Sequence, residues 1–219
     1  MLQGRTSNIA LRNFQFKLHD ESVRTARRGN MRGEKNSDIL KGLAAGFVGG
    51  LVAAVVMNQF QKVLGRMITG EERSHGAQSL QPGAPHHGAG RMLEKHGAED
   101  ADDDSAERLA QTIAVGLFER ELTKSEKDKA GTALHYAYGI SMGAVYGAAA
   151  EILPAVTSGA GMPYGALIWI GADEGVVPLL GLSKSAKEYP PSILASAFAA
   201  HLVYGLTTEL VRGAARKIL

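Results

Sequence analysis

The chain has 219 residues, a formal net charge of +2 at pH 7 and no cysteine. The absence of cysteine excludes disulfides, thiolate metal sites and a cysteine nucleophile, and the small net charge gives no support for nucleic-acid binding. Hydrophobic residues make up 45% of the chain. They are concentrated in four runs separated by polar segments, so the average composition hides a strong segregation.

Residues 1–38 are polar and mostly basic. They contain no apolar stretch followed by a small-residue cleavage site, so we predict a basic N-terminal tail and no signal peptide. A second interpretation is that translation begins at Met31, because the polar run from Met31 to Asp38 directly precedes the first apolar segment. The sequence leaves the choice between Met1 and Met31 open.

The first apolar run, residues 39–60, predicts a transmembrane helix, since about twenty apolar residues cross roughly 30 Å of hydrocarbon. Gly42, Gly46 and Gly50 fall on one face of this helix. Small residues at this spacing let two helices approach closely in a bilayer, so we expect this face to pack against another helix. The alternative is a glycine-rich helix without a special partner.

Residues 61–131 are predicted to lie outside the membrane, and glycines and prolines punctuate them as far as residue 104. We interpret 65–104 as a loop without regular structure. Its four histidines indicate either a solvated loop or a transition-metal site. We favour the solvated loop, because no two of them lie four apart on a predicted helix, and we expect neither metal nor cofactor. The histidines are His75, His86, His87 and His96.

An acidic run, Glu99–Asp104, directly precedes Ser105. Serine is a favoured N-cap, and acidic residues suit the positive end of a helix dipole. We therefore predict an amphipathic helix over about 105–122 that lies on the membrane surface or against the other helices. A short polar helix from Ser125 to Lys129 then leads into the second span.

Residues 132–212 hold three further apolar runs, each long enough to cross a bilayer as a helix. The predicted fold class is therefore all-α: a polytopic membrane protein with a four-transmembrane-helix bundle and an amphipathic helix in its long first loop. Basic residues flank the first and the last span, which places both termini in the cytoplasm. The three runs are Ala133–Leu153, Gly161–Leu182 and Ser192–Val211, followed by a basic C-terminal tail over 213–219.

Six ionisable residues interrupt these three runs. Such residues are costly in lipid and usually face the interior of a helix bundle, so we expect a polar seam. A rise of about 1.5 Å per residue places three of them near the middle of two neighbouring helices. This depth predicts that His201 meets Asp173 or Glu174. The six residues of the seam are His135, Glu151, Asp173, Glu174, His201 and Glu209.

Two members of the seam, His135 and Glu151, lie about 24 Å apart along one helix and mark its opposite ends. Glu151 is then close in depth to Glu209 and Arg212. Polar residues of this kind often only bond helices together, whereas two adjacent acids at mid-depth favour a proton-responsive site. Both interpretations remain open. The same span carries a second predicted helix-packing face, formed by Gly139, Gly143 and Gly147.

Pro178, one turn after Glu174, predicts a kink or a break in the third span. Broken spans are where transporters place their binding sites, although proline kinks also occur in ordinary spans. The single tryptophan, Trp169, is interpreted as an interface anchor or a core residue.

Three groups of residues in the C-terminal half occur in a characteristic order and spacing. They are His135 with Gly139, Gly143, Tyr146, Gly147, Ala150, Glu151 and Pro154; Gly165–Trp169 with Asp173, Glu174 and Pro178–Leu182; and His201–Tyr204 with Glu209 and Arg212. Together they resemble a family of uncharacterised bacterial inner-membrane proteins, the YagU-like group or DUF1440 family. The resemblance extends from about Leu40 to Arg212. It implies four spans in the bacterial plasma membrane and no particular reaction.

Enzymatic activity is not expected, because the chain lacks a phosphate-binding loop, a nucleophile elbow and a zinc-binding helix motif. The leading hypothesis is a structural or accessory subunit that packs with other membrane proteins or with itself. The alternative is a small proton-responsive transporter or channel that uses Asp173, Glu174 and His201, acting as a dimer. In both hypotheses the lipid bilayer is a partner and nucleic acid is not.

Overall fold

The computed structural model describes residues 35–67, 85–100 and 102–219, and these residues form helices, turns and loops without a β-strand. Most of the predicted basic tail, Met31 and His75 lie outside the described residues. The chain divides into two units, Met1–Leu40 and Lys41–Leu219. Of the first unit, the structure describes the opening turns of a helix. All packing described below lies within the second unit.

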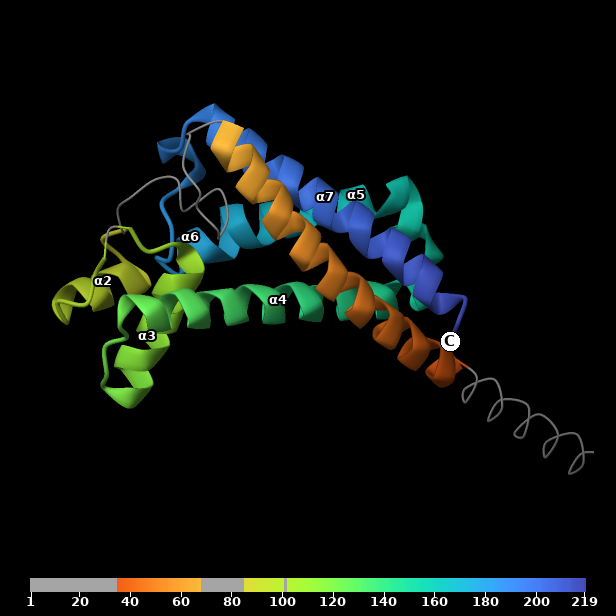
Figure 1. Ribbon diagram of the computed structural model, residues 1–219, viewed down its shortest axis with the longest axis horizontal. Helices are drawn as coiled ribbons and strands as arrows, with labels where there is room; N and C mark the ends of the chain where they lie inside the picture. Colours follow the sequence, from red (N-terminus) through yellow and green to blue (C-terminus); the bar gives the residue numbers. More distant parts are fainter. Residues whose placement is uncertain (1–34, 68–84, 101) are drawn as a thin grey trace, which may run out of the picture. The chain divides into compact units, whose positions relative to one another are not determined.

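Two helices in the described part of the chain are long and apolar enough to cross a membrane by length and composition. They are the first helix, Lys35–Met67, and α7, Pro191–Arg216 (Figure 1). Both extend past the predicted spans, because the residues that follow the apolar runs include good helix formers such as leucine, lysine and arginine. The predicted tail over 213–219 therefore begins inside α7.

The second apolar run belongs to a longer helix, α4 (Lys124–Ile152). It begins at a capping box, in which the Glu126 amide donates to the Thr123 hydroxyl and the Thr123 amide donates to the Glu126 carboxylate. Such a reciprocal pair satisfies two amides that a helix N-terminus leaves without a partner. The predicted short helix over 125–129 is therefore the first part of α4.

The third apolar run forms one continuous helical stretch with an irregular middle. A proline inside a helix has no amide hydrogen, and its ring collides with the carbonyl four residues earlier, which for Pro178 is that of Glu174. We attribute the π-helix directly before the proline to this collision. The parts of the stretch are α5 (Met162–Ile168), the π-helix η3 (Trp169–Val176) and α6 (Val177–Leu179), preceded by the 3₁₀ segment η2 (Pro154–Gly161).

The interpretation of 65–104 as a loop is wrong over α2 (Gly88–Lys95). A short glycine-rich helix has little stability of its own, so tertiary packing decides whether it forms. The packing here is a small apolar cluster in which Leu93 of α2 lies against Ala98 and Val115. Helix propensity is a property of the local sequence, so it does not predict such a tertiary contact.

The amphipathic helix α3 (Ser105–Phe118) ends earlier than the predicted 105–122. Its N-cap is Asp104, not Ser105, since the Asp104 carboxylate accepts hydrogen bonds from the Ala106 and Glu107 amides at 2.8 Å. It ends because Glu119 adopts a left-handed conformation, with φ 50°, which an α-helix cannot continue.

The first helix and α4 contact each other through glycines. A methyl group built on Gly50 would lie 2.6 Å from the carbonyl oxygen of Gly139, and one built on Gly42 would lie 2.6 Å from that of Gly147. No side chain larger than hydrogen fits between two backbones this close. The pairing is in reverse order, so the two helices are antiparallel. The contact uses Gly42, Gly46 and Gly50 on one helix and Gly139, Gly143 and Gly147 on the other.

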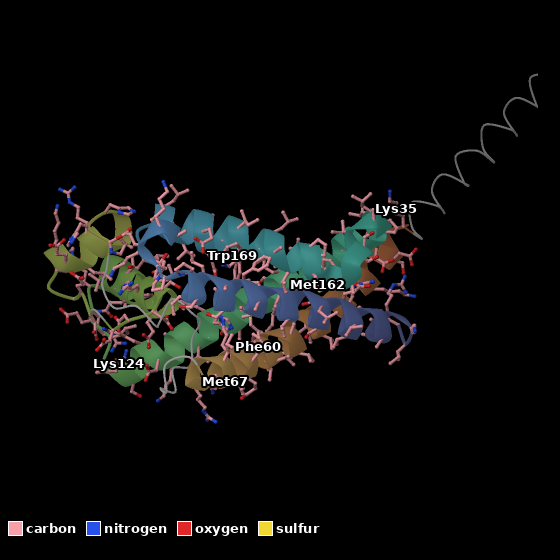
Figure 2. All side chains as sticks on the ribbon, turned by 90° about the horizontal axis from the view of Figure 1, so that it is seen from above. Lys35, Phe60, Met67, Lys124, Met162 and Trp169 are labelled. Atoms are coloured by element: carbon pink, nitrogen blue, oxygen red, sulfur yellow. The ribbon has the colours of Figure 1, made fainter. Side chains whose placement is uncertain are left out.

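α7 packs against α5 at a similar close approach, where a methyl group on Gly205 would lie 2.9 Å from the Gly165 amide nitrogen. Trp169 lies edge-on to Phe198, with ring centroids 5.0 Å apart, so it is packed inside the fold. Figure 2 shows mostly carbon atoms on the long helices around Phe60 and Trp169, whereas nitrogen and oxygen atoms gather near Lys124. A buried apolar cluster joins the first helix, α5 and α7: Ala53, Met57, Ile168, Ala200 and Tyr204.

Candidate functional site

Four helical segments surround a partly open cavity of about 90 Å³. Its walls come from the first helix, α4, the α5–η3 stretch and α7, and the first turn of α3 forms the remaining wall. A polar cavity of this size has room for more than one water molecule. Six side chains with polar groups line it: Gln61, His135, Tyr138, Asp173, His201 and Tyr204.

Asp173 and His201 face each other at this cavity. His201 Nε2 lies 3.6 Å from Asp173 Oδ2, and the two side chains are 8% and 23% exposed. The distance is within the range of an ion pair and longer than a hydrogen bond. The structure therefore brings together two of the three residues that depth counting placed near mid-helix.

The backbone fixes which nitrogen of His201 can exchange a proton. His201 Nδ1 lies 2.9 Å from the carbonyl oxygen of Ala197, and a carbonyl oxygen only accepts hydrogen bonds. Nδ1 therefore carries a hydrogen and donates it to Ala197. The second nitrogen, Nε2, faces the Asp173 carboxylate, so the proton that the imidazole gains or loses is the one between these two side chains.

The position of Asp173 depends on the π-helix η3, which extends on both sides of it. A π-helical turn shifts the direction of the side chains that follow it relative to a regular α-helix. Such insertions are frequent at functional sites. Pro178 therefore influences the cavity indirectly, through the backbone geometry that carries Asp173.

Glu174 is not part of the cavity lining. It lines an open groove together with His86, His87 and Glu188. Adjacent residues on a helix point in different directions, so only one of the two neighbouring acids can face His201. The three-residue group expected from the sequence is therefore reduced to a pair.

His135 lines the same cavity as Asp173 and His201, although the sequence placed it at a separate depth. Along the first helix the cavity extends from Ala54 to Gln61, about 10 Å at the rise of an α-helix. The same cavity therefore extends from the depth of His135 to the depth of Asp173 and His201.

The described histidines of the 65–104 segment, for which a metal site was the less favoured interpretation, are held separately. His87 Nε2 lies 2.9 Å from the Pro178 carbonyl oxygen, His96 Nδ1 lies 2.8 Å from that of Met92, and His86 Nδ1 lies 3.5 Å from the Glu94 carboxylate. Within the described ranges, no group of three or more His, Cys, Asp or Glu side chains has the geometry to hold a metal ion.

The remaining seam residues lie in ion pairs near the ends of α4 and α7. Arg212 Nε donates to Glu209 Oε2 at 2.7 Å, and Arg216 Nε donates to Glu151 Oε1 at 2.8 Å. Arg212 Nη1 also lies 3.8 Å from Glu151 Oε1. Two guanidinium groups balance two carboxylates, which is an arrangement that joins helix ends and needs no ligand.

Sequence reasoning missed a cluster of acids and lysines between α3 and α4. Lys127 Nζ lies 2.6 Å from Asp103 Oδ2 and 3.3 Å from Asp100 Oδ2, and Lys124 Nζ lies 3.3 Å from Asp103 Oδ1. The signal was present, because an acidic run at 99–104 precedes lysines at the start of the next helix. The acidic run was interpreted only as a complement to the helix dipole. We call Asp100, Asp103, Glu107, Lys124 and Lys127 the acid–lysine cluster.

Glu107 is the member of this cluster with the most altered proton affinity. Burial and a hydrogen bond with Asp128 raise the pKa of its carboxyl group to about 7. The Asp104 amide donates to the Glu107 carboxylate, and Lys124 Nζ lies 3.3 Å from it, but these two groups oppose the rise in pKa only in part. The direction is expected, because acids outnumber lysines in and around the acid–lysine cluster.

Residues 107–210 match the model of a family described as a protein of unknown function (DUF1440). The match is narrower than the stretch from Leu40 to Arg212 that carried the resemblance. It contains most of α3, all of α4 and both Asp173 and His201. No curated protein and no solved structure matches the chain. Over residues 107–210 the chain is similar to the DUF1440 family, and this match supports the family assignment that the resemblance implied.

Proposed function

We propose that the chain is a non-enzymatic integral membrane protein of the bacterial plasma membrane that acts as a small proton-responsive transporter or channel. It crosses the bilayer four times, through the first helix, α4, the α5–α6 stretch and α7. Both termini are cytoplasmic. The working group is the pair Asp173 and His201.

The packing supports four spans. α4 has 29 residues, about 40 Å of helix, and it lies antiparallel to the first helix. Large apolar side chains on α4 and α5–η3 are exposed, including Val145, Leu167 and Ile170. Exposed apolar side chains on long packed helices are what lipid would cover.

The observation that carries the proton-responsive function is the meeting of Asp173 with His201 at a polar cavity. With His201 Nδ1 bound to a carbonyl, the pair has two states, with and without a proton on Nε2. In the first state a cation faces the carboxylate, and in the second a neutral imidazole does. A buried carboxylate without a compensating charge is costly in a low-dielectric environment, so the two states favour different arrangements of the helices around the cavity.

The test is proton flux in liposomes that contain the purified protein and a pH-sensitive dye. A pH step across the membrane should produce flux with the parent protein and none with Asp173→Asn, which keeps the size of the side chain. Glu174→Gln is the matched control, since this neighbour lies outside the cavity, and it should retain flux. Fluorescence of Trp169 checks that each variant is folded. Absence of flux in the parent, or equal flux in Asp173→Asn, would contradict the proposal.

A second candidate function is an accessory subunit that packs with other membrane proteins. An open groove of about 780 Å³ between α3 and α4 favours it, because its lining is almost wholly apolar. Ile113 and Phe118 of α3 and Leu134 of α4 contribute to this lining. A helix of another membrane protein would cover such a surface.

Gentle purification from native membranes tests this second candidate. A constant co-purifying membrane protein, lost from an Ile113→Glu variant and retained in a Glu121→Gln variant, would support it. Recovery of the parent protein alone, as a monomer, would argue against it.

A further inference from the structure

The first turn of α3 is the only part of the cavity wall, within the described residues, that does not come from the long helices. Ser105 and Ala106 form this wall, and both have small side chains. The other lining residues belong to the first helix, α4, the α5–η3 stretch and α7. Displacement of one helical turn at Ser105 would therefore widen the access to the cavity while the long helices keep their contacts with one another.

Ion pairs attach the first turn of α3 to α4. Asp103, two residues before Ser105, has a fully buried side chain and contacts Lys127, which is 8% exposed. Asp100 reaches the same lysine, and Lys124 contacts Asp103 from the other side. These ion pairs hold the residues that lead directly into the cavity wall.

The apolar attachment of α3 is weak by comparison. Leu117 and Phe118 at its C-terminal end are 75% and 71% exposed. The apolar side chains that α3 buries are small: Ala110, Ala114 and Val115. Small side chains bury little apolar area, so the ion pairs contribute much of what keeps the first turn of α3 in place.

We propose that the first turn of α3 is a gate to the cavity and that Lys127, paired with Asp103 and Asp100, holds it closed. The proposal rests on the proposed function, since it describes how the Asp173–His201 pair gains access to the aqueous phase. Breaking the ion pairs opens the gate, and the four long helices keep their positions.

Accessibility of a single cysteine measures the gate directly, because the chain has no cysteine of its own. Met57 lines the cavity and is buried, so Met57→Cys reports entry of a charged methanethiosulfonate reagent. The measurement uses the full-length protein in lipid nanodiscs, where both faces are open to the reagent. Adding Lys127→Ala should raise the modification rate about tenfold or more, since removal of one partner of a buried pair is strongly destabilising.

Two variants control this measurement. Lys127→Arg preserves the charge and should keep the parent rate. Lys129→Ala removes an exposed lysine from the same part of α4 and should also keep it. If Lys127→Ala does not fold by Trp169 fluorescence, Lys124→Ala replaces it, because Lys124 is half exposed, and a smaller acceleration is expected. An unchanged rate in a folded variant, or equal acceleration by Lys129→Ala, would overturn the proposal.

The outcome separates the gate from the proton function. Faster modification of Met57→Cys after Lys127→Ala, without proton flux in the parent protein, would support the gate and contradict the proposed function. Proton flux in the parent protein, with an unchanged modification rate after Lys127→Ala, would support the proposed function and contradict the gate.

Discussion

α4 has two faces that differ in the space they leave. Toward the first helix, Gly139, Gly143 and Gly147 bring two backbones into contact, with no room for a side chain. Toward η3 and α7, His135 and Tyr138 border a cavity of about 90 Å³. Close packing of two regular helices resists rearrangement, because any shift opens a void or creates an overlap. We therefore expect any movement to occur on the cavity face, with the glycine face as its fixed support.

The largest expected effect comes from filling the glycine face. A Cβ atom on Gly143 would overlap the Gly50 backbone and lie 2.6 Å from the Gly46 carbonyl oxygen. Gly143→Leu should therefore destabilise the protein by about 3 kcal/mol or more, since backbone overlap cannot be relieved by a side-chain rotation. Denaturation in detergent, followed by helical circular dichroism, measures the loss.

Gly213→Leu is the matched control on α7. Its nearest atom would be Glu209 Oε1, at 4.0 Å, so the substitution should be neutral or stabilise by up to about 1 kcal/mol through helix propensity. Equal stability of Gly143→Leu and the parent would show that the first helix and α4 are not in contact through their backbones.

The two faces also differ in how far the sequence predicts them. A glycine spacing of four residues is a local pattern, and the six glycines with this spacing lie at the contact between the first helix and α4. The cavity depends on η3 and on the three-dimensional path of α3, and neither has a local pattern. Pro178 indicated an irregular third helix but not which of Asp173 and Glu174 faces His201, because one added residue per turn redirects the side chains that follow. Lys127 and Asp103 lie 24 residues apart, and only the folded helices show that they meet.

The next largest effect is expected from a substitution that alters the cavity and leaves the glycine face intact. Pro178→Ala removes the ring that collides with the Glu174 carbonyl, so we expect η3 to return toward a regular α-helix. The Asp173 carboxylate would then turn away from His201 Nε2. Proton flux in liposomes should fall about tenfold or more, equivalent to a loss of at least 1.4 kcal/mol in the rate-limiting step, while thermal stability is retained.

Pro163→Ala controls for the removal of a proline from the same helical stretch. Pro163 lies in the first turn of α5, where proline does not disturb helical hydrogen bonds, so flux should remain at the parent level. Unchanged flux in Pro178→Ala would mean that η3 does not set the position of Asp173.

The smallest expected effect is the change in stability with pH that arises from Glu107, the residue after Ala106 of the cavity wall. The folded protein raises the pKa of Glu107 from 4.5 to about 7 by burial and by its hydrogen bond with Asp128. Between these two values the folded state binds a proton that the unfolded state does not. The resulting stability is fully present below pH 4.5 and is lost as the pH rises through 7. None of the six contact glycines has an ionisable side chain, so their backbone contact should not respond in this range.

Melting temperatures of the parent and of Glu107→Gln at pH 5.5 and pH 8.5 test this difference. The parent should melt at a lower temperature at pH 8.5, and the variant should show a smaller decrease, because glutamine stays neutral at both values. Glu121→Gln, at an exposed position beyond the end of α3, should behave as the parent does. A parent that is more stable at pH 8.5 would mean that the charged form of Glu107 is the better partner for Lys124. The ion pair at 3.3 Å would then outweigh burial, and the acid–lysine cluster would tighten as the pH rises.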